Sequence, residues 1–405
     1  MGTETTIQEY RARARQWLEG HAPAYGAAAR HGLSAEEDLA LGRAWMALKY
    51  DAGYSGIAWP REHGGQGLGP LEKLAFEEEE MQFGFPTDYF AVSLGMPVPI
   101  VLRYLTGDWV LERAKAALRG EEIWCQLFSE PSGGSDLAGL RMRATRDEAT
   151  GDWRLDGQKL WTTYAQHSDY GIMVARHDPT LQKHQGLTYF WIDMRAPGIT
   201  VRPIKLSDGS DHVNEVFFDN VLVPDSQRLG PVGGGFKVAL ETLVIERHHA
   251  SDPAGFGPAL DLFVREAAEA AVNGASVLDD GRVRERIARN YALQNGLRAI
   301  QARGQLMLGL GAEPGPEGAI NKLVAARARQ RLSEYVIDLR GPLGVVAQPD
   351  ASRHSDWVRS WLSVPTARQA GGSDEMLLNT IAERILGLPQ DHRPDKGVPF
   401  NQIPK

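Results

Sequence analysis

The sequence contains almost no cysteine: Cys125 is the only one in 405 residues, so no disulfide can form within the chain. A chain without disulfides fits a reducing compartment, and we predict a cytoplasmic protein. No apolar run reaches the roughly 18 residues that a membrane-spanning helix needs. Lysine and arginine form no block, and 44 of them against 52 acidic residues leave a net charge of −8. This balance argues against nucleic acid as the main partner.

What the sequence does contain indicates a large globular protein with helices at both ends. Hydrophobic residues make up 42% and charged residues 24%, which are ordinary values for folded chains. Helical spacing dominates up to residue 121 and again after residue 232, whereas short strands separated by turns lie between. We therefore predict an α+β multidomain fold with domains over 1–121, 122–232 and 233–388, and an extended tail over 389–405.

Two local patterns carry narrower expectations. Asp156-Gly157 stands between two short runs of strand-forming residues, which predicts a hairpin turn at that point. The stretch from Glu77 to Glu80 is acidic throughout, which predicts a solvated helix face.

The stretch from Cys125 to Ser135 is the most informative part of the chain. Its uncharged beginning stops at Pro131, which donates no backbone hydrogen bond and prevents a helix from continuing. Gly133 and Gly134 then allow the backbone to approach a bulky partner closely. Exposed amides beside small side chains suit a flat polar ring or a phosphate. The same stretch is also compatible with an ordinary loop.

The chain resembles the acyl-CoA dehydrogenase family in five blocks that occur in the family's order. The blocks are Trp59 to Gly67, Phe128 to Asp136, Lys159 to Thr163, Gly235 to Ala239 followed by Glu246-Arg247, and Gly371 to Glu375 followed by Ile381 to Leu388. The resemblance implies the family's fold, which has an N-terminal helical domain, a central β-barrel or sandwich and a C-terminal four-helix bundle.

The resemblance also implies an activity. It points to a flavoprotein oxidoreductase of fatty acid or sterol catabolism that holds FAD non-covalently and converts an acyl-CoA thioester to the 2-enoyl-CoA. Electrons would pass to an electron-transfer flavoprotein, and a homo- or hetero-oligomer, dimeric or tetrameric, would complete each flavin site. In this reaction the α-proton leaves as H⁺ and a β-hydrogen leaves as hydride. Because the α-proton is weakly acidic, a carboxylate must reach it in a dry pocket.

Cofactor and substrate contacts follow from the same resemblance. The implied cofactor contacts are Gln126, Phe128, Ser129 and Ser135, then Trp161, Thr162 and Thr163, and finally Gly372, Ser373 and Glu375. Ser135 and Arg247 would also bind the CoA ester. Trp161 would pack beside the isoalloxazine while the Thr163 hydroxyl approaches its N5 atom. The competing interpretation of Trp161 is a buried strand aromatic.

The catalytic base is where this sequence departs from the commoner family pattern. Many relatives place a glutamate where this chain has Gly371, which has no side chain. A minority place it on the first C-terminal helix, where this chain has Glu246. Helical steps of three and four align Glu246 with Ala239 on an apolar stripe, whereas Glu241 points away. Apolar surroundings raise a carboxyl pKa, which suits a general base. A core ion pair of Glu246 with an arginine is the alternative.

Two blocks through which relatives hold a neighbour's FAD are altered here. Asn273 to Val283 lacks an Arg-x-x-Phe-Gly run, and Asp338 to Gly344 lacks a glutamine before Gly-Gly-x-Gly. Two further hypotheses stay open: an acyl-CoA oxidase-type flavoenzyme, and a non-catalytic partner subunit of a heteromeric acyl-CoA dehydrogenase. We expect no metal site, because the adjacent His248 and His249 diverge on a helix although Asp252 follows them.

Overall fold

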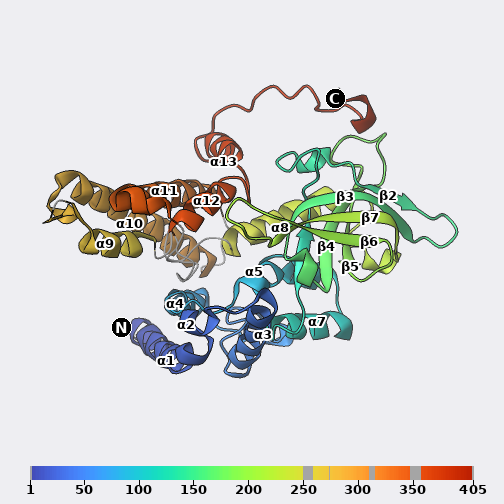
Figure 1. The fold of residues 1–405 in the computed structure, drawn as a ribbon. Helices are drawn as coiled ribbons and strands as arrows, with labels where there is room; N and C mark the ends of the chain where they lie inside the picture. Colours follow the sequence, from blue (N-terminus) through green and yellow to red (C-terminus); the bar gives the residue numbers. More distant parts are fainter. Residues whose placement is uncertain (1, 250–258, 273, 310–314, 347–356, 404–405) are drawn as a thin grey trace. The chain divides into compact units, whose positions relative to one another are not determined.

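The computed structural model describes residues 2–249, 259–272, 274–309, 315–346 and 357–403 (Figure 1). The chain divides into two compact units. The first unit comprises Met1–Leu41, Gly67–Pro86 and Ala250–Pro389, and the second comprises Gly42–Gln66, Thr87–His249 and Gln390–Lys405. Helices and a sheet in one chain confirm the predicted α+β class. The domain boundaries at residues 121, 232 and 388 stay a prediction.

The second unit is built around a seven-stranded sheet. Its strands are β1 (Trp124–Leu127), β2 (Arg143–Arg146), β3 (Trp153–Thr163), β4 (Tyr170–Arg176), β5 (Leu187–Asp193), β6 (Ile199–Ile204) and β7 (Val213–Val223). They are ordered β1-β4-β2-β3-β7-β6, and β5 pairs with β4. The β1–β4 pair is parallel, whereas β3–β7, β4–β5 and β6–β7 are antiparallel.

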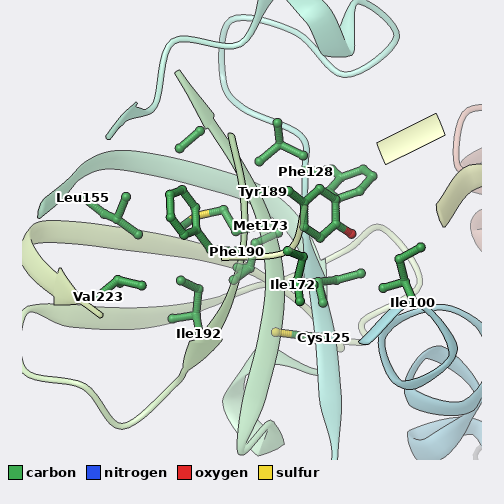
Figure 2. Packing of buried hydrophobic residues seen from close by; sticks show 14 of the residues in the cluster. Ile100, Cys125, Phe128, Leu155, Ile172, Met173, Tyr189, Phe190, Ile192 and Val223 are labelled. Carbon is green, nitrogen blue, oxygen red and sulfur yellow. The ribbon is translucent and has the colours of Figure 1, made fainter. Parts of the chain in front are cut away.

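The core of this unit lies between the sheet and the helices that cover it. Ile172 and Met173 of β4 and Phe190 and Ile192 of β5 are completely buried (Figure 2). Both strands are covered on two faces, so their apolar residues form continuous runs instead of alternating. Cys125 lies in the same core, and burial raises the pKa of its thiol to about 12. It is therefore a packing residue and not a nucleophile.

Several helices of the second unit pack on this core. They are α5 (Asp88–Gly95), α6 (Pro97–Tyr104), α7 (Asp108–Leu118) and α8 (Gly235–His249), while α3 (Ala35–Asp51) spans the boundary of the two units. Helix α5 contacts β1, and α8 contacts α6, β4 and β5. A Cβ on Gly235 would lie 2.6 Å from the carbonyl carbon of Thr188. Glycine at this position thus lets α8 begin directly against β5.

The predicted hairpin at Asp156-Gly157 is wrong. Both residues lie inside β3, whose register with β7 shifts between Leu155 and Gly157. A Cβ on Gly157 would lie 3.2 Å from the Met142 Cα, so the glycine permits a close approach of two backbones. The chain reverses instead between β2 and β3, where the Asp147 amide donates to the Asp152 carbonyl at 2.8 Å.

The first unit consists mainly of helices. They are α1 (Gly2–Tyr25), α2 (Ala27–Arg30), α4 (Pro70–Glu80), α9 (Ala259–Glu269), α10 (Gly281–Gly309), α11 (Gly318–Arg340), α12 (Trp357–Ala367) and α13 (Asp374–Thr380), with the short strands β8 (Ala271–Val272) and β9 (Ala275–Ser276). Helix α11 contacts α9, α10, α12 and α13, which makes it the centre of the C-terminal bundle. Over the described ranges, none of the helices combines the length and the apolar character needed to cross a membrane.

The acidic run in α4 is not solvated throughout, contrary to expectation. Glu79 is 1% exposed and pairs with Arg11 at 3.1 Å and Arg15 at 2.7 Å, both from α1. Burial opposes ionisation of Glu79, but the hydrogen bonds from Arg15 and Arg11 outweigh it and lower the pKa of the carboxyl. Three residues earlier, Phe76 is also buried, so helical spacing places Glu79 on the inner face.

Candidate active site

The glycine-rich loop after β1 forms a tight, exposed turn. Glu130 and Gly133 exchange backbone hydrogen bonds of 3.1 and 3.0 Å, and residues 131–136 are exposed. A Cβ on Gly134 would lie 3.2 Å from Ser129 Oγ, whereas a Cβ on Gly133 would have no heavy atom within 4 Å. Gly134 therefore packs on the loop itself, and Gly133 leaves its backbone open to a partner.

A buried ion pair between Lys159 and Glu130 attaches this loop to the sheet, and it was not predicted from the sequence. The Lys159 ammonium is 0% exposed and donates to Glu130 Oε1 at 2.8 Å, to the Phe128 carbonyl at 3.2 Å and to the Val174 carbonyl at 2.8 Å. All three of its protons therefore have acceptors. Burial lowers the pKa of Lys159, and the adjoining carboxylate counteracts that effect. The pair fixes Phe128 and Glu130 to strands β3 and β4.

The carboxylate of Glu130 also organises the backbone beyond the loop. It accepts hydrogen bonds from the Arg141 amide at 2.6 Å and from the Met142 amide at 3.0 Å. Glu130 therefore joins the two ends of the segment that carries Ser135. The sequence could have predicted that Lys159 points inward. Alternate residues of a strand face the same side, and Lys159 is an even number of residues from the buried Trp153 and Leu155.

The end of β3 brings the second group of predicted residues to the same loop. The Leu160 amide donates to the Ser129 carbonyl at 2.9 Å. Trp161 follows in a left-handed backbone conformation (φ 62°), where the register with β7 is irregular between Lys159 and Thr162. Its side chain is 54% exposed, so the interpretation of Trp161 as a buried strand aromatic is wrong. The exposed indole and the positive φ are both compatible with the predicted contact between Trp161 and a flat ligand.

Two orphaned polar groups test whether a flavin suits this surface. Gln126 Nε2 and Thr162 Oγ1 are buried and have no hydrogen-bond partner among the described residues. Thr162 is only 1% exposed, and its carbonyl already accepts from Asn214 Nδ2 at 3.0 Å. A buried donor without an acceptor costs about 1–3 kcal/mol. A flavin ring edge, which presents carbonyl and nitrogen acceptors, would satisfy such donors, so these residues fit the cofactor.

Helix α8 is attached to the loop through a buried hydroxyl pair. Thr242 and Tyr189 are 0% exposed, and their hydroxyl oxygens lie 2.9 Å apart. The Tyr189 ring meets the Phe128 ring edge-on, with centroids 5.9 Å apart (Figure 2). Glu246, the predicted base, lies one helical turn after Thr242 and is half-buried. The helix position of Glu246 is thus set by contacts that lead to Phe128.

The other acidic residue of α8 is occupied elsewhere. Glu241 accepts a hydrogen bond from the Tyr104 hydroxyl at 2.9 Å and pairs with Arg103 at 3.2 Å. Burial raises the pKa of Tyr104 to about 12, and the Glu241 carboxylate adds to the shift. Glu241 therefore connects α8 to α6, and the role of Glu246 as the base stays a prediction.

The predicted residues of the closing block lie in the first unit. Gly372 has φ 99°, and the Ser373 hydroxyl caps α13 by accepting from the Met376 amide at 3.4 Å. Glu375 is exposed. Asp374 between them is buried and accepts from Arg327 at 2.9 Å, which fixes the start of the helix. Gly371 likewise has positive φ, 65°.

Some predicted residues cannot be placed. The side chains of Arg247, His248 and His249 and the whole of Asp252 lie outside the described part of the structure, so the ester contact and the absence of a metal site stay predictions. Asn273 lies outside it as well. Ser135 is described, and its side chain is exposed at the tip of the glycine-rich loop. Thr163 pairs with Val213 in the β3–β7 ladder.

Comparisons with known families and sequences identify similar proteins over most of the chain. The family model for the acyl-CoA dehydrogenase middle domain matches residues 125–221, and that for the C-terminal domain matches residues 233–386. The acyl-CoA dehydrogenase IpdE1 of Mycobacterium tuberculosis is 32% identical over 393 residues, covering 95% of this chain and 98% of the relative. The acyl-CoA dehydrogenase FadE34 of the same organism is 35% identical over 341 residues, covering 84% of this chain and 45% of FadE34.

Solved structures show the same fold. A variant of the steroid acyl-CoA dehydrogenase Tcur3481-Tcur3483 superimposes with a TM-score of 0.78 at 25% identity, covering 96% of this chain and 100% of that chain. A glutaryl-CoA dehydrogenase from Mycobacterium smegmatis in complex with FADH2 superimposes with a TM-score of 0.74 at 21% identity, covering 96% of each chain.

Proposed function

This chain belongs to the acyl-CoA dehydrogenase family, and from that premise we propose that it uses FAD to introduce an α,β double bond into an acyl-CoA thioester. The observation that carries the proposal is the surface formed by the glycine-rich loop and the end of β3. There Trp161 is exposed, and the next residue, Thr162, carries a buried hydroxyl that has no hydrogen-bond partner among the described residues; the buried Nε2 atom of Gln126 on β1 likewise has none among them. Such a surface is incomplete without a flat polar ligand.

We propose that the residues at this surface hold the flavin ring. Phe128 and Ser129 present the backbone at the ring edge, Gln126 and Thr162 donate to it, and Thr163 reaches toward it from the end of β3. Bound FAD would supply the acceptor for the hydride that leaves the β-carbon. Gly372, Ser373 and Glu375 are assigned to the adenylate end, and Ser135 and Arg247 to the CoA ester. Ser373 already caps α13, so its contact with FAD would run through backbone atoms.

Glu246 is the proposed base that removes the α-proton. Its carboxylate would accept the proton while donors on the loop bind the thioester carbonyl. Glu241 cannot replace it, because Tyr104 and Arg103 engage that carboxylate. The proposed electron acceptor is an electron-transfer flavoprotein, and the steroid enzyme named above makes a bulky steroid acyl-CoA the first substrate class to test. The cytoplasmic location stays a prediction.

The test of the base compares two isosteric changes on one helix. Glu246→Gln should keep FAD but lower the rate of acyl-CoA dehydrogenation by about two orders of magnitude, the usual contribution of a positioned base. Glu241→Gln is the matched control and should change that rate less than about fivefold. Stopped-flow reduction of the bound flavin measures both. Equal losses in the two variants would remove Glu246 from the role.

One observation favours a second candidate function. The segments Asn273 to Val283 and Asp338 to Gly344 lack the residues with which relatives bind a neighbour's FAD. A non-catalytic subunit that completes a partner's site is therefore the alternative, and a colourless protein that gains flavin only with a co-expressed partner would select it. An oxidase would instead reduce oxygen directly, which oxygen consumption with acyl-CoA alone would reveal.

A further inference from the structure

The C-terminal segment, residues 390–403, lies against the loop that follows β4 (Figure 1). The Phe400 amide donates to the Leu181 carbonyl and the Asn401 amide to the Pro179 carbonyl, each at 2.9 Å. Pro399 forms an isolated antiparallel bridge with Gln182. The segment is thus attached to loop 177–186 through its backbone at several successive positions, as an added short strand would be.

A buried arginine at the start of that loop connects the C-terminal segment to the glycine-rich motif. Arg176 is 4% exposed, and its guanidinium donates to the Ala138 carbonyl at 2.6 Å and the Leu140 carbonyl at 3.0 Å. These two carbonyls belong to the turn directly after Ser135-Asp136. The same guanidinium also lies over the ring of Phe400, with 3.5 Å between Arg176 Cζ and the ring centroid.

The contact with Phe400 is important for Arg176 because its buried guanidinium has little access to water. Burial lowers the pKa of Arg176 to about 10, and the nearby Glu130 and Asp136 carboxylates counteract that effect. An aromatic face is a favourable neighbour for a desolvated guanidinium. Phe400 therefore closes the arginine off from water while its N–H groups remain directed at the motif.

A second cation makes a parallel connection. The Lys183 ammonium is 14% exposed and lies between two carboxylates, Asp136 of the motif at 2.7 Å and Asp395 of the C-terminal segment at 2.8 Å. The Lys183 carbonyl in turn accepts from Arg176 Nη1 at 3.2 Å. Both cations that hold residues 136–140 are therefore covered by the C-terminal segment.

We propose that the C-terminal segment clamps the Ser135–Asp136 region, and that Phe400 and Asp395 are positioning residues for the ligand that this region binds. The proposal rests on the proposed function for the identity of that ligand, an acyl-CoA. When the segment is displaced, water reaches Arg176 and Lys183. The hydrogen bonds from Arg176 to the Ala138 and Leu140 carbonyls then compete with water and become weaker. Glu246 lies on α8, outside these contacts, so the clamp should affect ligand binding and not the chemical step.

The test compares Phe400→Leu with Phe217→Leu in the full-length holoenzyme. Phe217 on β7 of the same unit also contacts an arginine, Arg202, with 4.9 Å between Cζ and the ring centroid, but this arginine is exposed. Hydrogen exchange is read at the Gly139 and Leu140 amides, which donate within the turn after the motif. Phe400→Leu should accelerate their exchange roughly tenfold, because it takes the aromatic ring away from the buried Arg176 guanidinium and from Arg141, whose Cζ lies 5.7 Å from the same ring centroid. Phe217→Leu should leave it unchanged.

Steady-state kinetics then separate positioning from a general structural role. Phe400→Leu should raise the KM for acyl-CoA about tenfold and change kcat less than about twofold. Phe400→Trp keeps an aromatic face beside the guanidinium, so its KM and kcat should equal those of the unaltered enzyme. Asp395→Asn should shift KM in the same direction. Unchanged exchange at Gly139 and Leu140, or a KM equal to that of the unaltered enzyme, would overturn the proposal. If the unaltered protein does not turn over acyl-CoA, the proposed function fails. Hydrogen exchange at Gly139 and Leu140 then still tests whether the C-terminal segment stabilises the turn after the motif.

Discussion

Removing the ammonium of Lys159 should be among the most damaging single changes in the second unit. Lys159→Met deletes three hydrogen bonds, to Glu130 Oε1, Phe128 O and Val174 O, and removes the ion-pair partner of the Glu130 carboxylate, which is 4% exposed and still interacts with the more distant charge of Arg176. Breaking a buried ion pair by removing one partner costs about 3–5 kcal/mol. The Arg141 and Met142 amides still donate to the carboxylate, so we expect the lower part of that range, about 3 kcal/mol.

Glu130, the second member of the pair, provides a further test, because Glu130→Gln should change the free energy of unfolding in opposite directions in two backgrounds. In the unaltered protein, Glu130→Gln leaves the lysine charge uncompensated and should destabilise the fold by about 3 kcal/mol. Added to Lys159→Met, the same change removes an unpaired buried charge, while the amide oxygen can still accept from one of the two backbone amides. It should then recover about 1–2 kcal/mol.

Urea unfolding at pH 7, followed by tryptophan fluorescence, measures these free energies; Trp124 and Trp153, which are buried in the same unit, contribute to the signal. Arg143→Met is the control, because the Arg143–Asp156 pair spans 3.2 Å with side chains 68% and 31% exposed. An exposed pair contributes less than about 1 kcal/mol. If Lys159→Met costs no more than this control, or if Glu130→Gln has the same sign in both backgrounds, the buried pair does not hold the loop.

Two further predictions concern acid stability and flavin affinity. Hydrogen bonds from Arg228 lower the pKa of Asp225 to about 2, so its stabilising contribution is complete above roughly pH 4, the unfolded value, and is lost as the pH falls to about 2. Asp225→Asn should remove that part of the acid dependence in thermal melts between these pH values, and an unchanged pH profile would contradict the assignment. Thr162→Val should leave melting unchanged or raised, because the hydroxyl has no partner among the described residues, but should weaken FAD binding to the apoprotein about tenfold. Thr145→Val, at an exposed position on β2, should leave FAD affinity as it is, and equal affinity in both variants would place the flavin elsewhere.

Much of the fold was accessible to sequence reasoning because its signals are local. The helical spacing of the two ends, the strands of the middle and the turn at Pro131 are all set by residues close in sequence. The family resemblance predicts that the glycine-rich loop and the end of β3 contribute to one flavin site. The structure joins them by the Leu160–Ser129 hydrogen bond.

The errors arise where two distant segments meet. The Asp156-Gly157 pair has hairpin chemistry, but its glycine serves the close approach of Met142, which no local pattern shows. Strand alternation places Lys159 inward, and the irregularity after it then turns Trp161 outward, so a strict period of two fails at the end of β3. Glu79 shows the same limit, because its partners Arg11 and Arg15 belong to another helix.

The central claim, that the chain is a flavin-dependent acyl-CoA dehydrogenase, is tested most directly by anaerobic titration of the purified protein with acyl-CoA thioesters from short chains to steroid side chains. The account predicts a yellow protein whose flavin absorbance is bleached by at least one thioester and returns when an electron-transfer flavoprotein is added. A colourless protein, or a flavin that none of the thioesters reduces, would contradict it.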